Sequence, residues 1–250
     1  MKKAVLITVL LMVVITLALG AFAGCDLTRK VKGAERTFPS KVTKAKDLSF
    51  KMDIDYKKGD TSISIAMDCY KTTTETGEEE YTYFYSHPAA RSDSYQNLYA
   101  DGKLYEIVNL TKNAGTYYVK EGVGVDDEGN IMYHVSKKIF LTSVAAFISK
   151  AKKDTVKGEE VYRYDVDING KSISLWYNDE VLVQLYAKFA DENGGDAEEY
   201  TFGFSDYKFD EKADAAVFSR PNAPGSFYLE SPYAFEDWMG VMTSFGGKIG

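Results

Sequence analysis

The sequence contains few of the residues on which most catalytic and metal sites depend. Its 250 residues include only 2 Cys and 2 His, which excludes a disulfide framework and leaves little for a metal centre or a His-based catalyst. Proline is also scarce, at 5 residues, so the chain is neither collagen-like nor largely disordered. Acidic residues outnumber basic ones by 37 to 30, and a net charge of -7 gives no electrostatic footprint for nucleic acid.

The chain does have a large apolar and aromatic content, with 45% hydrophobic residues, 19 Tyr and 14 Phe. This is enough to build the core of one large domain. We considered three roles for the aromatic residues: core packing, an amphipathic cavity, and a carbohydrate-stacking surface. No Gly-x-Ser-x-Gly or similar nucleophile motif accompanies His87 or His134, so we predict no enzyme and no cofactor. Cys69 shares a predicted strand face with Ile63 and Ile65, which indicates a core residue rather than a reactive thiol.

The N-terminal segment has the organisation of an export signal. Lys2 and Lys3 are followed by an almost wholly apolar run from Ala4 to Ala18, and then by small residues that lead to Cys25. A transmembrane helix is the alternative, because the apolar run is just long enough to span a bilayer.

The motif Phe22-Ala23-Gly24-Cys25 resembles the bacterial lipobox, with Phe22 where that motif prefers Leu. The resemblance implies a signal peptide over residues 1–24 and acylation of Cys25, the palmitate-type modification of lipoproteins. Two or more acyl chains give stable membrane anchoring, so Cys25 would hold the protein to the extracytoplasmic face of a membrane. Residues 25–46 are then the anchor and a basic, flexible tether, in which Ser40 is able to cap a short helix.

Residues 47–225 are expected to form the folded domain. Leu48, Phe50, Met52, Ile54 and Tyr56 alternate with polar residues, which predicts a strand with one buried face. Similar runs recur along the domain, separated by turn sequences such as Asp101-Gly102 and Asn169-Gly170. Successive hairpins of this kind predict an antiparallel meander of about ten strands.

One segment has a helical period instead. Residues 134–153 place seven apolar side chains on one side of a helix: Val135, Ile139, Phe140, Val144, Phe147, Ile148 and Ala151. The predicted fold class is therefore α+β, a strongly curved antiparallel half-barrel with this amphipathic helix on its concave face. We predict a ligand cavity between helix and sheet, lined by Phe140, Val144 and Phe147 from the helix and by Met52, Met67 and Leu185 from the sheet.

Two further stretches of the folded domain resemble those of a known family. They are GEEVYRYDVDINGKSISLWYNDEVLVQL, which begins at Gly158, and YKFDEKADAAVFSRP, which begins at Tyr207. Together with the lipobox, the hairpins and the helix insertion, they resemble the LolA/LolB-like superfamily of lipoprotein carriers and the LppX/LprG-type lipoproteins. The resemblance implies a half-barrel whose hydrophobic cavity holds acyl chains. It identifies no lipid specificity residue.

The remaining motifs are typical of turns and hairpins rather than of metal-binding sites. The run from Asp165 to Gly170 begins like a calcium-binding loop, but Trp176 stands where a bidentate Glu is needed. The acidic run from Asp126 to Asn130 is typical of a solvated turn. Residues 226–250 are expected to form an aromatic tail or a short helix. The favoured function is binding of a lipid or other apolar ligand by a membrane-anchored lipoprotein, and the alternative is an envelope sensor or interaction module with a filled core.

Overall fold

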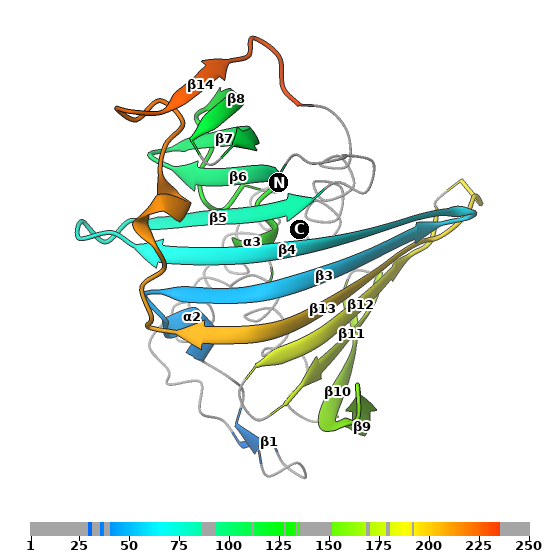
Figure 1. Ribbon diagram of the computed structural model, residues 1–250. Helices are drawn as coiled ribbons and strands as arrows, with labels where there is room; N and C mark the ends of the chain where they lie inside the picture. The colour runs from blue at the N-terminus through cyan, green and yellow to red at the C-terminus, as the bar shows by residue number, and fades with distance from the viewer. Residues whose placement is uncertain are drawn as a thin grey trace, which may run out of the picture.

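A single large sheet dominates the computed structural model (Figure 1). The structure describes residues 30–31, 36–37, 41–86, 94–111, 113–127, 129–133, 135, 152–168, 171–178, 181–191 and 193–235. The sheet has 12 strands in the order β14-β8-β7-β6-β5-β4-β3-β13-β12-β11-β10-β9, and it is curved but not closed. Two short strands, β1 (Lys30–Val31) and β2 (Arg36–Thr37), pair separately.

The sheet consists of two antiparallel meanders. The first contains β3 (Leu48–Lys58), β4 (Thr61–Thr73), β5 (Glu79–Ser86), β6 (Ser94–Ala100), β7 (Lys103–Thr111) and β8 (Ala114–Glu121). The second contains β9 (Lys152–Val156), β10 (Glu159–Ile168), β11 (Lys171–Tyr177), β12 (Leu182–Phe189) and β13 (Glu198–Phe209). Antiparallel pairing of β3 with β13 joins the two meanders into one sheet.

Local turn chemistry explains why neighbouring strands pair in this way. Asp101 and Gly102 both have positive φ angles, of 55° and 68°, and they join β6 to β7. A two-residue turn with both residues at positive φ matches the right-handed twist of the flanking strands. The hairpin predicted at Asp101-Gly102 is therefore confirmed.

The two faces of the sheet carry cores of different size. The larger core covers what we call the inner face, on which α3 (Ile131–Tyr133) also packs. The opposite, outer face has a smaller cluster made of Leu98, Ala100, Tyr105, Ile107 and Tyr117. This division follows from the alternation of side chains along each strand, since successive residues point to opposite faces.

The helical part of the prediction differs from the structure. Lys152 and Lys153 begin β9 and pair with Arg163 and Tyr162, so the expected helix over residues 134–153 does not extend to its predicted end. Residues 136–151, with Phe140, Val144 and Phe147, lie outside the described residues. The sheet also has 12 strands rather than about ten.

The segments that flank the expected domain take part in the fold. In the expected tether, α2 (Lys41–Lys44) is followed by Ala45, and both Val42 and Ala45 are buried in the inner core. In the expected tail, residues 227–230 form β14 (Phe227–Glu230), which is a strand rather than a helix and pairs in parallel with β8. The fold therefore extends beyond both predicted boundaries.

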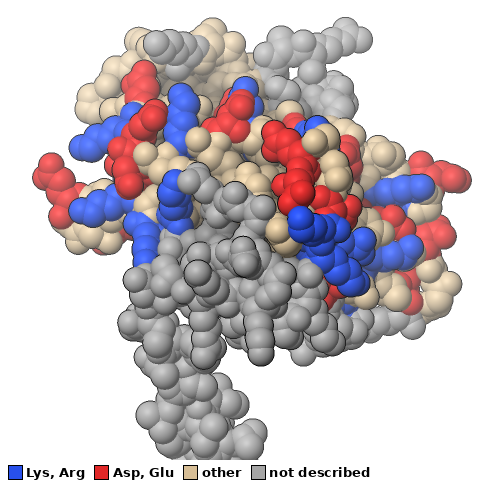
Figure 2. All heavy atoms as spheres, turned by 90° about the horizontal axis from the view of Figure 1, so that it is seen from below, with Lys and Arg blue, Asp and Glu red and all other residues tan. Residues whose placement is uncertain are grey.

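Charged side chains are distributed without a single-sign patch on the face shown in Figure 2, where basic and acidic residues are interspersed. No helix in the described part of the chain is long and apolar enough to cross a membrane.

A strap of residues 210–226 connects β13, in the interior of the sheet, to β14 at one of its edges. After β13 it passes the ends of β3, β4 and β5 and reaches β14 (Figure 1). It contains the short 3-10 helix η2 (Ala215–Phe218), whose first turn is capped by the Asp214 carboxylate. Arg220 fixes the strap to the outer face, because its guanidinium donates to Glu80 Oε1 at 2.5 Å and to Asp101 Oδ2 at 3.0 Å.

The Arg220→Met substitution is expected to lower the free energy of unfolding by about 2–3 kcal/mol, because Glu80 then remains buried without its charged partner. Lys188→Met removes the exposed ion pair with Glu199 and should cost less than about 1 kcal/mol. Urea unfolding followed by circular dichroism measures both. Equal losses for the two variants would show that Arg220 does not hold the strap.

Candidate ligand-binding face

The inner face of the sheet presents its side chains in rows that cross the strands. Residues directly opposite each other in antiparallel strands share a face, so the strand register defines each row. One row contains Leu175, Leu185, Phe202, Ile54 and Ile65. The adjacent row contains Phe204, Met52, Met67, Tyr85 and Tyr95. Apart from the partly buried Tyr95, every one of these side chains is buried, and together they form what we call the apolar floor.

Three of the predicted cavity residues are therefore brought together. Met52 and Met67 are direct cross-strand partners, with exposed fractions of 0% and 3%. Leu185, also 0% exposed, belongs to the adjacent row, where it lies opposite Phe202. The two rows are in contact, because the rings of Phe202 and Phe204 stack with centroids 6.5 Å apart. The other three predicted residues, on the expected helix, are outside the described residues.

Two further rows on the inner face are more polar. One contains Phe50, Cys69, Tyr83 and Asn97, and the next contains Leu48, Lys71, Tyr81, Tyr99 and Leu104. All are buried, including Asn97 and Lys71. The inner face thus changes from an apolar floor to a region with hydrogen-bonding groups along the direction of the strands.

The buried Lys71 is neutralised and hydrogen bonded. Its ammonium group donates to the carbonyl of Ala45 at 2.7 Å and forms an ion pair with Glu79 at 3.1 Å. The Tyr81 hydroxyl donates to the same Glu79 carboxylate at 2.9 Å. A buried charge is tolerated when it is paired and hydrogen bonded in this way, so Lys71 presents no net charge to the inner face.

Tyr83 and Tyr99 are both fully buried, yet their hydroxyl groups differ. Tyr83 accepts a hydrogen bond from Asn97 Nδ2 at 3.1 Å and donates to the Gly129 carbonyl at 3.4 Å, a long distance for an O–H donor. The Tyr99 hydroxyl makes no hydrogen bond of normal geometry to the described residues, although it lies close enough to the Tyr83 hydroxyl for each group to affect the pKa of the other. Burial raises the pKa of both phenols, and the charge of Asp127 adds to the rise in the pKa of Tyr99.

A cover of residues 123–133 lies over these polar rows. It contributes Val123, Ile131 and Met132 to the inner core, and the Tyr133 and Tyr81 rings form a T-shaped pair with centroids 6.5 Å apart. Asp127 belongs to the acidic run that was expected to form a turn, and its Oδ1 accepts a hydrogen bond from the Gly129 N–H at 2.9 Å. Asp127 therefore stabilises a turn, and no metal-ligating cluster occurs among the described residues.

The other motifs also have structural roles. Cys69 is 0% exposed, and burial raises the pKa of its thiol, which confirms its place in the core. The Asp165 carboxylate accepts from Arg163 Nε of the same strand at 2.6 Å and, across the β10–β11 hairpin, from Ser174 Oγ at 2.8 Å. These contacts are those of a surface hairpin rather than a calcium loop.

Sequence reasoning missed the polar rows. Lys71 continues the alternation of Met67 and Cys69, so its position on the inner face was readable from the strand period. Asn97 and Tyr99 follow Tyr95 in the same way. The missing hydrogen bond of Tyr99 had no sequence signal, because it depends on where the cover residues lie.

No protein-family model matches the sequence, and no curated protein matches it. Several solved structures are similar at low identity. LprF from Mycobacterium bovis is 11% identical over 66% of this chain and 87% of LprF, with a TM-score of 0.40. A putative outer membrane lipoprotein-sorting protein domain from Vibrio parahaemolyticus is 10% identical over 69% of this chain and 88% of that domain, with a TM-score of 0.30. PNGF-II is 11% identical over 80% of this chain, with a TM-score of 0.31.

The chain spans only about a third of the length of PNGF-II, of which 33% is covered. Each of these TM-scores lies below 0.5, so the functional argument rests on the residues of this chain.

We expect Tyr83→Phe to lower the free energy of unfolding by about 1–2 kcal/mol, because it removes two hydrogen bonds of a buried hydroxyl. Tyr99→Phe should leave it unchanged or raise it by up to about 1 kcal/mol, since it removes a buried hydroxyl without a partner. Paired denaturant titrations test this contrast. A loss for Tyr99→Phe equal to that for Tyr83→Phe would mean that the Tyr99 hydroxyl is bonded.

Proposed function

We propose that the protein is a membrane-anchored lipoprotein that binds an uncharged lipid on the inner face of its curved sheet. The observation that carries this proposal is the buried hydroxyl of Tyr99, beside the apolar floor, which makes no hydrogen bond of normal geometry to the described residues. A buried polar group without a partner is costly, and a ligand that supplies the hydrogen bond removes that cost. The apolar floor and the adjacent polar rows would therefore match the acyl chain and the polar group of an amphipathic molecule.

The charge state of the site favours a neutral polar group on this ligand. Lys71 is already paired with Glu79, so the ammonium group is not available to compensate a buried anion. Tyr99, with its raised pKa, stays protonated at neutral pH and is able to donate to an ester carbonyl or a hydroxyl group. The acyl chain would then extend along the floor that contains Met52, Met67 and Leu185. A diacylglycerol has this combination of groups.

Ligand entry requires movement of the cover, because Tyr99 is fully buried. The hydrogen bond from Tyr83 to the Gly129 carbonyl is the contact to be broken, and at 3.4 Å it is a weak one. The polar end of the lipid would take the place of Gly129 beside Tyr83 and Tyr99. Binding and opening are thus coupled through residues 123–133.

A separate observation favours the alternative function, an envelope interaction module. Among the residues that the structure describes, four large apolar side chains are well exposed, and three of them lie on or just after β14 at one edge of the sheet: Leu110 at 61%, Phe227 at 76%, Leu229 at 73% and Tyr233 at 77%. Exposed apolar groups at a sheet edge are typical of protein contact sites. A protein partner at β14 without any lipid on the inner face would support this alternative.

Binding of a fluorescent diacylglycerol to the purified full chain in detergent tests the lipid proposal. Tyr99→Phe should weaken binding about fivefold, the equivalent of one neutral hydrogen bond, while the protein remains as stable as the wild type. Tyr56→Phe is the matched control, because Tyr56 lies at the far end of the inner face, next to Tyr200. Equal affinity of all three proteins, or no binding, would contradict the proposal and favour the interaction module.

The anchor is tested through the two cysteines. Cys25→Ala should abolish incorporation of labelled palmitate in bacterial cells and release the protein from the membrane fraction, because no acyl chain is attached. Cys69→Ala should keep the label, since this thiol is buried in the core. Labelling that survives Cys25→Ala would refute acylation at this position.

A further inference from the structure

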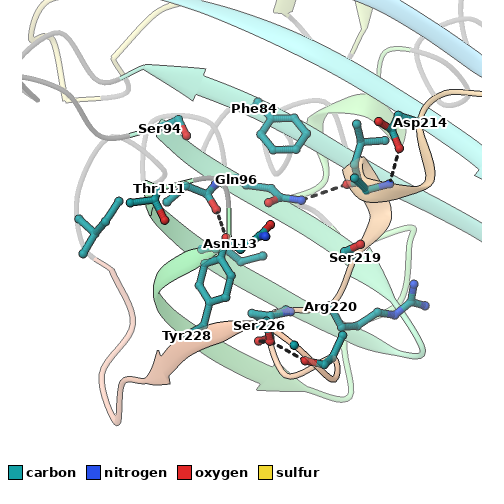
Figure 3. A pocket seen from close by; sticks show the side chains of 18 of the residues that line it. Phe84, Ser94, Gln96, Thr111, Asn113, Asp214, Ser219, Arg220, Ser226 and Tyr228 are labelled. Carbon is teal, nitrogen blue, oxygen red and sulfur yellow. Dashed lines mark hydrogen bonds between the residues drawn. The ribbon is translucent and has the colours of Figure 1, made fainter.

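A groove of about 630 Å³ lies on the outer face, away from the proposed lipid site. Its floor is formed by β6 and β7, and its walls are formed by the strap and by Tyr228 of β14 (Figure 3). The volume is within the range of small-molecule sites, about 300–1,000 Å³. The groove forms where the strap lies over the consecutive strands β5, β6 and β7, which sheet pairing holds side by side.

The charged groups at the rim of the groove, Arg220 and Asp214, already have hydrogen-bond partners within the protein. Arg220 is directed away from the groove in Figure 3 and binds Glu80 and Asp101. The Asp214 carboxylate accepts the N–H of Ala216 at 3.0 Å and caps η2. The described lining therefore offers no uncompensated charge, and this disfavours a phosphate, a carboxylate or a cationic ligand.

The centre of the groove is rich in amides and hydroxyls with unused capacity. Gln96 donates from Nε2 to Thr82 Oγ1 and to the Val217 carbonyl, both at 3.1 Å, and this leaves its Oε1 as an acceptor. Asn109 Oδ1 accepts from the Tyr228 hydroxyl at 2.6 Å, so its NH₂ group remains a donor. The exposed amide of Asn113 and the hydroxyl of Thr111 extend this neutral, mixed set of donors and acceptors.

Two aromatic rings complete the groove. Phe84 lies directly opposite Gln96 in the strand register. Tyr228, which is hydrogen bonded to Asn109, lies at the opposite side of the groove from Phe84 (Figure 3). The negatively polarised face of an aromatic ring packs well against polarised C–H groups. A pyranose ring has such C–H groups on one face and hydroxyls, which both donate and accept, at its edge.

We propose that this groove binds a neutral oligosaccharide. An extended peptide fits less well, because peptides gain affinity from main-chain hydrogen bonds at a sheet edge, whereas the main-chain groups of β6 are paired with β5 and β7. The side-chain amides and hydroxyls instead match the sugar hydroxyls, and Phe84 and Tyr228 supply the stacking surface. This inference does not depend on the proposed lipid function, since it concerns the opposite face.

Saturation-transfer NMR on the full chain, in a detergent without a sugar headgroup, tests the inference. The probes are maltotriose, triacetylchitotriose and a β-linked galactotriose, with a terminally blocked Gly-Ser-Thr hexapeptide as the peptide probe. Phe84→Leu should weaken saccharide binding about tenfold by removing the stacking ring. Asn113→Ala, an exposed position, should weaken it about threefold through the loss of one hydrogen bond.

The matched control is Tyr186→Leu, which removes an outer-face ring on β12, outside the groove. Circular dichroism establishes that each variant is folded. Saccharide transfer that falls with Phe84→Leu and Asn113→Ala but not with Tyr186→Leu supports the inference. It is overturned if none of the three saccharides receives transfer at millimolar concentration, if the three variants behave alike, or if the hexapeptide binds instead.

Discussion

The pairing of β3 with β13 is the contact on which the rest of the structure depends. These strands belong to different meanders and are separated by well over a hundred residues, yet they run opposite each other from Lys58 and Glu198 to Leu48 and Phe209. Both rows of the apolar floor cross this seam, one through Ile54 and Phe202 and the other through Met52 and Phe204. Without it, each meander would expose half of the floor to water.

The two faces of the joined sheet then serve different purposes. The inner face carries an apolar floor beside hydrogen-bonding rows that include the paired Lys71 and the buried Tyr99. The outer face is mostly solvated, and the strap converts part of it into a neutral groove. Arg220 links these features, because the strap that it fixes at Glu80 also connects β13 to the edge strand β14. One sheet thus supports two chemically distinct surfaces.

The strand pattern and the turn residues were sufficient to predict the meanders, and the placement of Met52, Met67 and Leu185 on one face followed from the period of two. The edge strands were not predictable. β9 has no buried side chain to create an alternation, and β14 exists because the strap carries it to β8. The polar end of the candidate site escaped prediction for a similar reason, since the state of the Tyr99 hydroxyl depends on the cover and not on the local sequence.

Native mass spectrometry of the full chain, purified from the membranes in which it is made, tests the central claim most directly. The account predicts one additional mass per chain that corresponds to an uncharged acyl lipid and is released by organic extraction. The covalent acyl groups on Cys25 would remain attached through the same extraction and so are distinguished from the bound ligand. A protein mass without any releasable lipid would contradict the account.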